Sequence, residues 1–193
     1  MSVVVNIVSQ TASWIAADGR ASQNGIIVSE NTPKIKKIND RVYVGYTGTL
    51  DTAEKILAKL ETPEQKKIFA LADCEGVAKA ISCIVNLSAI VESAKAQFVV
   101  TGANIDGGMA SYTIDFGGNL IKYLPENETA LKLVVLSTGN HGVELKDYII
   151  PEINSHGVCS ESIKAGVKRF IAAVSKRDNS VNTNVTFLSL RGF

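Results

Sequence analysis

The sequence predicts an α+β fold of four layers, αββα, in which two antiparallel sheets lie between pairs of helices. Strand-like and helix-like segments occur in blocks, in the order four strands, two helices, four strands, two helices and one strand. A doubly wound parallel sheet would instead alternate strands with single helices. Several strand-like segments are continuous apolar runs, which is typical of strands covered on both faces. With 193 residues, of which 46% are hydrophobic, the chain can form a single domain, 1–193, with a sizeable core.

The first block of strands covers about the first fifty residues. Residues 3–8 (VVVNIV) are rich in β-branched side chains, and residues 13–17 (SWIAA) form a second apolar run. Residues 34–38 are a short, half-polar strand. The ND pair at 39–40 marks a turn, and a fourth strand follows at 41–46.

The next segment has the period of an amphipathic helix. Its apolar residues recur three or four positions apart, which predicts a helix over 50–60 with one buried face. The residues of this face are Leu50, Ala53, Ile56, Leu57 and Leu60. The same period predicts a second helix over about 64–92. Residues 84–91 are apolar nearly all round, which favours burial on two sides, as at a contact between subunits.

The second block of strands is a meander with glycine pairs in its tight turns, followed by one more strand. These strands are expected at 98–101, 109–115, 119–123 and 131–136. Two amphipathic helices come next, one that begins after Gly142 and ends near Ile153, and one whose buried face runs from Ile163 to Val174. A last strand is expected at 184–190.

Composition and charge argue against several classes of protein. Lys and Arg (20) balance Asp and Glu (19), so the net charge of +1 gives no electrostatic reason to bind nucleic acid or an anionic membrane. No apolar run reaches the roughly 18 residues of a membrane-spanning helix, and the first residues lack the basic and apolar regions of a signal peptide. Three cysteines without a CxxC pair favour reduced thiols, so we expect the protein in the cytoplasm.

Motifs for cofactors, phosphates and common hydrolytic sites are missing from the sequence. It contains no GxGxxG, GxxxxGK[ST], HExxH or GxSxG pattern, so we expect neither a cofactor nor a metal. The presence of only two histidines argues against a metal site built on histidines and against a Ser-His-Asp triad. His141 follows Ser137 closely enough to act as its base, but such neighbours are common in loops. We therefore expect structural or surface roles for His141 and His156.

Hydrolysis without histidine needs another base, and a nucleophile at the N-terminus carries one. A free α-amine has a pKa of about 7.7–8.0, which suits general-base catalysis near neutral pH. Removal of Met1 would expose Ser2, whose hydroxyl could attack a carbonyl carbon while its own amine accepts the proton. If Met1 is retained, Ser2 has an amide nitrogen and no such base.

Four residues of the sequence, Ser2 among them, follow one another at nearly constant intervals. Asp18 lies sixteen residues after Ser2, at the end of the second apolar strand in AADGRAS. Lys34 follows sixteen residues later in TPKI, and Gly48 fourteen residues after that, in GYTGT before a helix. These intervals and their surroundings resemble the proteasome β-subunit and HslV family of N-terminal nucleophile (Ntn) hydrolases, which are threonine peptidases.

The resemblance extends over nearly the whole chain and implies the same αββα fold. The STG segment at 137–139 resembles the family's Gly-Ser-Gly turn, with Thr138 in place of the family's hydroxyl residue. Asp178 follows the last helix, as the family's second aspartate does. The chain departs from the family at its nucleophile, because Ser2 stands where the family has threonine. Serine has the same hydroxyl but lacks the methyl group that restricts the threonine rotamer.

The resemblance implies catalytic roles for the spaced residues. Ser2 would attack the substrate, and the charge of Lys34 would lower the pKa of this nucleophile. Asp18 would pair with Lys34 and keep it charged. The backbone N–H of Gly48 would stabilise the tetrahedral oxyanion.

Further residues would orient the amine or form the cleft. By the same resemblance, Thr138 and Asp178 would orient the amine of Ser2 through hydrogen bonds. Three residues would support or line the substrate-binding cleft: Arg20, Ser22 and Thr47. Each residue taken singly also has an ordinary structural explanation. Lys34, for example, is one of three lysines in a strand whose side chains could simply face solvent.

The resemblance also implies partners. It implies that the substrate is a peptide or unfolded protein, that the chain forms a homo-oligomeric ring or double ring, and that an ATP-dependent unfoldase can serve it. Two alternatives on the same fold stay open: a non-catalytic ring subunit, and an Ntn amidase that acts on a small molecule. The short chain and the Asp18–Lys34 pair favour the peptidase.

Overall fold

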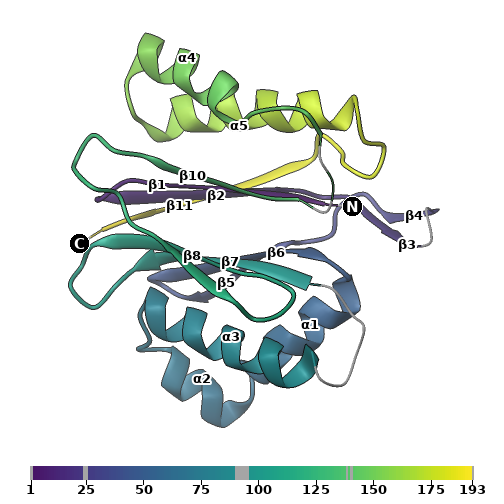
Figure 1. The fold of residues 1–193 in the computed structure, drawn as a ribbon, viewed down its shortest axis with the longest axis vertical. Helices are drawn as coiled ribbons and strands as arrows, with labels where there is room; N and C mark the ends of the chain where they lie inside the picture. Colours follow the sequence, from purple (N-terminus) through teal and green to yellow (C-terminus); the bar gives the residue numbers. More distant parts are fainter. Residues whose placement is uncertain (1, 24–25, 90–95, 138, 140, 193) are drawn as a thin grey trace.

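The computed structural model describes residues 2–23, 26–89, 96–137, 139 and 141–192. Figure 1 shows four layers: helices α4 and α5, a first sheet, a second sheet, and helices α1 to α3. The strand pairs within both sheets are antiparallel. The αββα arrangement predicted from the sequence is therefore confirmed.

The first sheet has β1 in its interior, and β1 carries the N-terminal end of the chain. The strand order is β10-β1-β2-β11. The strands are β1 (Val3–Val8), β2 (Ala12–Asp18), β10 (Lys132–Ser137) and β11 (Val185–Arg191). Val3 lies opposite Ser137 on one side of β1, and Val4 lies opposite Ala17 on the other. The start of β1 thus meets the ends of β2 and β10.

The second sheet packs face to face on the first. Its strand order is β5-β6-β7-β8-β9. The strands are β5 (Ile35–Asn39), β6 (Val42–Gly48), β7 (Ala96–Ala103), β8 (Met109–Ile114) and β9 (Leu120–Tyr123). Val4, Ile15 and Val99 belong to the apolar layer between the sheets. Gly45 lets the sheets approach closely, because a Cβ atom there would lie 2.7 Å from Cγ1 of Val4.

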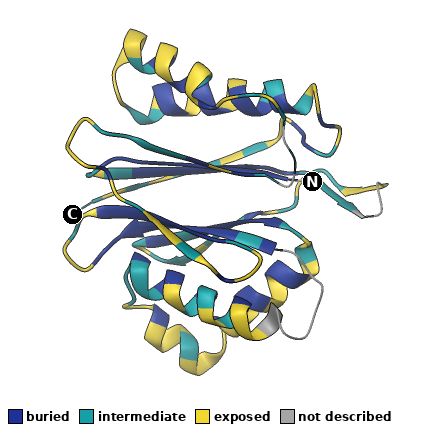
Figure 2. Cartoon of the chain, in the orientation of Figure 1, coloured by how far each residue is buried: buried dark blue, intermediate teal, exposed yellow. Residues whose placement is uncertain are grey.

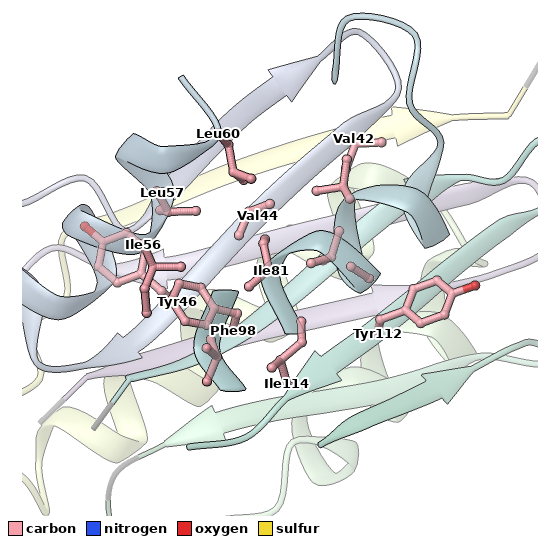
Figure 3. Packing of buried hydrophobic residues seen from close by; sticks show 14 of the residues in the cluster. Val42, Val44, Tyr46, Ile56, Leu57, Leu60, Ile81, Phe98, Tyr112 and Ile114 are labelled. Atoms are coloured by element: carbon pink, nitrogen blue, oxygen red, sulfur yellow. The ribbon is translucent and has the colours of Figure 1, made fainter. Parts of the chain in front are cut away.

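Helices cover the outer faces of both sheets. They are α1 (Leu50–Lys59), α2 (Pro63–Phe69), α3 (Cys74–Ala89), α4 (Lys146–His156) and α5 (Ser160–Ser175). Figure 2 shows buried residues on the helix faces that meet the sheets and exposed residues on the faces toward solvent. Figure 3 shows the core between the second sheet and its helices, where Tyr46, Ile81 and Phe98 pack together.

The structure corrects the single helix predicted over 64–92. Two helices, α2 and α3, take its place. The break between them has its own hydrogen bonds, since Nδ2 of Asn39 donates to the carbonyl oxygens of Phe69 (2.7 Å) and Ala72 (2.9 Å). Oδ1 of Asp73 accepts the N–H of Gly76 at 2.8 Å and so satisfies a donor in the first turn of α3. Residues 90–92 lie outside the described residues.

A short hairpin that the sequence analysis did not predict projects from the sheets. It consists of β3 (Ala21–Gln23) and β4 (Ile26–Ser29), which pair antiparallel. Figure 1 shows it at the same end of the molecule as the N-terminus. Its apolar side chains face solvent, with Ile26 70% and Val28 57% exposed in the single chain.

Candidate active site

Ser2 lies directly before β1, where β2 and β10 end. Because side chains alternate along a strand, Ser2 shares a face of β1 with Val4, which is buried between the two sheets. The hydroxyl of Ser2 is therefore on the side of the second sheet, not on the side of α4 and α5. Ser2 is buried in the structure, which includes Met1.

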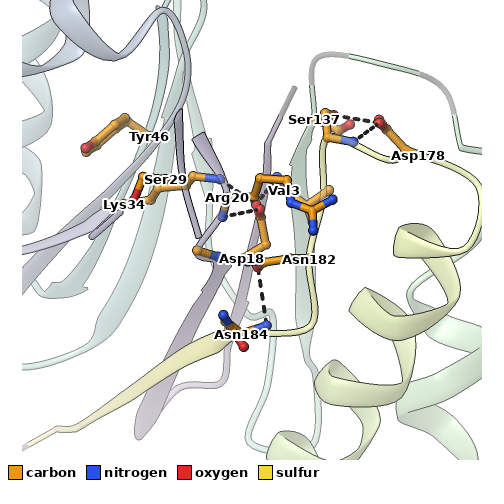
Figure 4. A network of polar contacts seen from close by, with 12 residues as sticks. Val3, Asp18, Arg20, Ser29, Lys34, Tyr46, Ser137, Asp178, Asn182 and Asn184 are labelled. Carbon is orange, nitrogen blue, oxygen red and sulfur yellow. Dashed lines mark hydrogen bonds and ion pairs between the residues drawn. The ribbon is translucent and has the colours of Figure 1, made fainter. Parts of the chain in front are cut away.

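Asp18 and Lys34 form a buried ion pair next to Ser2. Nζ of Lys34 lies 2.8 Å from Oδ1 of Asp18, and the two residues are 3% and 1% exposed. Oδ1 also accepts the N–H of Val3 at 2.8 Å, and Oδ2 accepts the N–H of Arg20 at 3.0 Å. One carboxylate thus holds both Lys34 and the start of β1, as Figure 4 shows.

The three neighbouring lysines have different environments. Burial lowers the pKa of Lys34 below its usual value, although the carboxylate of Asp18 favours the charged form. Lys36 forms an ion pair with Glu61, and Lys37 forms one with Asp40, and both pairs are much more exposed than that of Lys34. The geometry therefore places Lys34 in the interior and leaves its two neighbours at the surface.

Tyr46 fixes the backbone that carries Lys34. Its N–H donates to the carbonyl oxygen of Lys34 (3.1 Å), and its hydroxyl donates to that of Pro33 (2.8 Å). Burial raises the pKa of Tyr46 to about 12, and the charge of Glu54 acts in the same direction. The phenol thus stays protonated near neutral pH and keeps its role as a donor.

The end of β6 carries the residues predicted to contact the substrate and the oxyanion. Gly48 has a φ of +100°, a conformation that favours glycine, and α1 begins two residues later. Thr47 shares a face of β6 with Gly45, which approaches the first sheet. Oγ1 of Thr47 is buried and has no hydrogen-bond partner among the described residues.

A second polar cluster, made of Ser137, His141 and Asp178, lies near the start of β1. Oδ1 of Asp178 accepts the N–H (2.8 Å) and the hydroxyl (2.5 Å) of Ser180. Nε2 of His141 lies 2.5 Å from Oγ of Ser137, and its Nδ1 lies 3.6 Å from Oδ2 of Asp178. Thr138, which was predicted to orient the amine, lies outside the described residues.

The pKa of Asp178 is lowered. Burial raises it, but hydrogen bonds from the hydroxyl and N–H of Ser180 and the charge of His141 outweigh that effect. The sequence analysis assigned a site role to Asp178, but it expected a structural or surface role for His141. The short separation of His141 from Ser137 was the only signal of their contact, and many loops share it.

Arg20 connects segments at the edge of the site through an ion pair and a hydrogen bond. Its Nε lies 3.1 Å from Oε2 of Glu30, its Nη2 lies 3.0 Å from Oε1, and its Nη1 donates to the carbonyl oxygen of Asn179. Asn182 completes the link, because its Nδ2 donates to Glu30 and its Oδ1 accepts the N–H of Gly19 at 2.9 Å. Arg20 thus ties the end of β2 to the segment after α5. The sequence analysis missed the parts that Glu30 and Asn182 play.

Some predictions concern features outside this cluster. Ser22 lies in β3, opposite Ile27 on the projecting hairpin, and its role in binding substrate stays a prediction. Within the described ranges there is no group of three or more side chains that could hold a metal ion. No helix in those ranges is both long and apolar enough to cross a membrane.

Comparisons with known proteins match this architecture. The family model described as "Proteasome subunit" matches residues 2–125, which include Ser2, Asp18, Lys34 and Gly48. Among solved structures, 603 chains are significantly similar. One is the crystal structure of eukaryotic HslV from Trypanosoma brucei, with a TM-score of 0.68, 18% sequence identity, and coverage of 98% of this chain and 99% of that chain. At this identity the likeness shows the fold alone. No curated protein sequence is significantly similar.

Proposed function

The chain belongs to the proteasome subunit family, and from this premise we propose that it is a peptidase with Ser2 as its N-terminal nucleophile. The observation that carries the proposal is the buried Asp18–Lys34 pair, whose carboxylate also binds the N–H of Val3. Burying two charges costs desolvation energy, and apolar residues of similar size would often stabilise the fold as well as the ion pair does. A catalytic role accounts for such a pair one residue away from the nucleophile.

The proposed reaction needs a free amine on Ser2, and therefore the removal of Met1. Oγ of Ser2 attacks the carbonyl carbon of the peptide, and its proton passes to the amine. The charge of Lys34 stabilises the developing alkoxide, and the N–H of Gly48 donates to the oxyanion. The C–N bond then breaks, and the departing amine takes the proton. Water hydrolyses the resulting ester and restores Ser2.

We further propose that the enzyme works as a homo-oligomeric ring in the cytoplasm, where an ATP-dependent unfoldase can deliver substrate. Exposed apolar side chains support assembly, because Ile26 and Val28 on the hairpin and Leu87 on α3 would be covered by neighbouring subunits. Thr47 shares a face of β6 with Gly45, which approaches the first sheet, and we propose that substrate binds there, between the sheets.

Mass spectrometry tests the proposed nucleophile. The mature protein should lack Met1, and a β-lactone or peptide epoxyketone probe should add its mass at Ser2. Ser2→Ala should abolish labelling and leave the fold intact, because the position lies at the start of a strand. An active enzyme that retains Met1 would exclude the amine as the base. A chain with no activity would fit a non-catalytic subunit, and cleavage of small amides but not peptides would fit an amidase.

A further inference from the structure

His141 connects two elements that meet at the start of β1. Its side chain is 8% exposed, and it contacts Ser137 at the end of β10 and Asp178 in the segment after α5. Ser137 lies opposite Val3 in the first sheet, and Val3 directly follows the proposed nucleophile, Ser2. The imidazole thus links the strand beside Ser2 to the second aspartate of the site.

Each nitrogen atom of His141 faces one residue of this cluster. Oγ of Ser137 donates to the carbonyl oxygen of Gly139 (2.9 Å) and accepts the N–H of that residue (3.2 Å). Because a hydroxyl has one proton, Nε2 of His141 must be the donor to Oγ. Oδ2 of Asp178 is buried without a hydrogen bond in the described part of the chain, and Nδ1 of His141 faces it. Nε2 of His141 thus faces Ser137, and Nδ1 faces Oδ2 of Asp178.

The backbone of His141 is held by the same segment that carries Asp178. Nη1 of Arg177 donates to the carbonyl oxygens of His141 (2.9 Å) and Gly142 (2.7 Å). Gly142 has a φ of +58°, which turns the chain at this point. Since Arg177 precedes Asp178, the main chain and the side chain of His141 are both tied to residues 177–178. These bonds hold the backbone of His141 close to Asp178.

We propose that His141 is a positioning residue, which fixes Ser137 and Asp178 around the amine of Ser2. This inference rests on the proposed function. Ser180 donates to Oδ1 of Asp178, and the imidazole of His141 lies beside the other oxygen atom, Oδ2, so that both sides of the carboxylate have a polar neighbour. Without His141, Asp178 would retain a buried and uncompensated oxygen atom, and Ser137 would lose its link to the segment after α5. The amine would then be poorly oriented, while the peptide-binding surface between the sheets would be unchanged.

The same three residue types form the catalytic triad of serine hydrolases, which is the alternative role. Ser137 and His141 line a hollow of about 490 Å³ together with Leu133, Val143 and Phe170. Two observations favour positioning over a second nucleophile. The hydroxyl proton of Ser137 is already given to Gly139, and the 3.6 Å between Nδ1 and Oδ2 is longer than a hydrogen bond.

Three variants of the full-length protein test the proposal, with hydrolysis of a fluorogenic peptide and β-lactone labelling of Ser2 as readouts. His141→Ala should lower kcat and the labelling rate at least about tenfold, because small errors in the position of a catalytic group are costly. KM should stay nearly unchanged. His141→Gln should recover much of the loss, because its amide can still donate to Oγ of Ser137. His156→Ala is the matched control, since His156 also lies near a carboxylate, that of Glu152 at 3.7 Å, but its side chain is 67% exposed on α4.

Each outcome decides the proposal. In an Asp178→Asn background, His141→Ala should cost much less, because its partner is already altered. An unchanged kcat with a lowered melting temperature would make His141 merely structural. Labelling of Ser137 by a fluorophosphonate in Ser2→Ala would establish the triad instead. If the wild-type protein is not labelled at Ser2, the proposed function fails and this inference fails with it. Equal labelling of wild type and His141→Ala overturns the inference alone.

Discussion

Oδ1 of Asp18 is shared by Nζ of Lys34 and the N–H of Val3, each at 2.8 Å. Asp18 belongs to the first sheet, and Lys34 immediately precedes β5 of the second. One buried oxygen atom therefore joins the strand that carries Ser2 to the opposite sheet. Because the bond to Val3 is made by the backbone, a change of the Val3 side chain leaves the donor in place unless the new residue is proline. Asp18 is therefore the residue on which the arrangement depends.

The first prediction concerns the position of Lys34 among the three lysines. Lys34→Ala should raise the activation barrier for peptide hydrolysis by about 2–3 kcal/mol, because it removes a preorganised charge. Lys36→Ala and Lys37→Ala should have little effect on kcat/KM, since their ion pairs lie at the surface. Equal losses of kcat/KM in all three variants would show that activity depends on the positive charge of the whole strand edge and not on the buried ammonium of Lys34.

The second prediction is that Asp18→Asn destabilises the fold. It leaves the Lys34 ammonium buried without a counter-charge, which should lower the free energy of unfolding by about 3–5 kcal/mol. Urea unfolding measures this loss. Combining Asp18→Asn with Lys34→Met should cost less than the sum of the two single changes, because the pair acts as a unit. If the losses in the free energy of unfolding of the two single variants add up to that of the double variant, the ion pair does not contribute as a unit.

The third prediction is a pH dependence of stability that comes from Lys34. Burial lowers its pKa in the folded state below the 10.5 of the unfolded chain. Between these two values the unfolded state binds more protons, so the free energy of unfolding should rise with pH until about 10.5. Urea unfolding from neutral pH to 10.5 should show a shallower rise in Lys34→Met. Parallel curves for the two proteins would mean that Lys34 does not titrate differently on folding.

The fourth prediction tests the close approach of the two sheets. Gly45→Ala should cost about 1–3 kcal/mol of stability, because the new methyl group would overlap Val4, and to a lesser degree Ile15. Gly117→Ala is the matched control, since a Cβ atom there would meet no neighbour closer than 3.4 Å. Thermal unfolding of both variants measures the difference, and equal melting temperatures would show that the sheets can separate without cost.

The fifth prediction concerns assembly. Analytical ultracentrifugation should show a particle several times heavier than the 20.6 kDa chain. Ile26→Asp should weaken the particle, because it places a charge on an apolar surface that a neighbouring subunit would cover. Ile105→Asp, at an exposed isoleucine outside the hairpin, shows whether the effect is specific to the hairpin. A wild-type monomer at micromolar concentration would remove the argument for a chamber and would favour the small-molecule amidase.

The sequence predicted those features that depend on local pattern or on constant spacing. Apolar runs located β1 and β2, and the resemblance to the proteasome family implied the contact between Asp18 and Lys34 that the structure shows. The break between α2 and α3 was missed, because its hydrogen bonds come from Asn39, about thirty residues earlier in the chain. The β3–β4 hairpin was missed because its strands are very short.

The cluster around His141 could not be predicted for a related reason. Ser137 and His141 are close in sequence, but Asp178 reaches them only when α4 and α5 fold back over the first sheet. Arg177, which holds the backbone of His141, is equally remote in sequence. Spacing within one segment carries no information about such contacts, so their role emerges only from the packed structure.

The interior position of β1 has a practical consequence for producing the protein. Chain ends usually fray, but this one is held between β2 and β10 from Val3 onward. An affinity tag fused ahead of Ser2 would leave that strand paired, but it would put an amide in place of the free amine that the proposed mechanism needs. Arg191 lies opposite Ala12, at the end of β2 away from Asp18. A purification tag therefore belongs at the carboxyl end. A tag ahead of Ser2 would give a folded protein that lacks the proposed base.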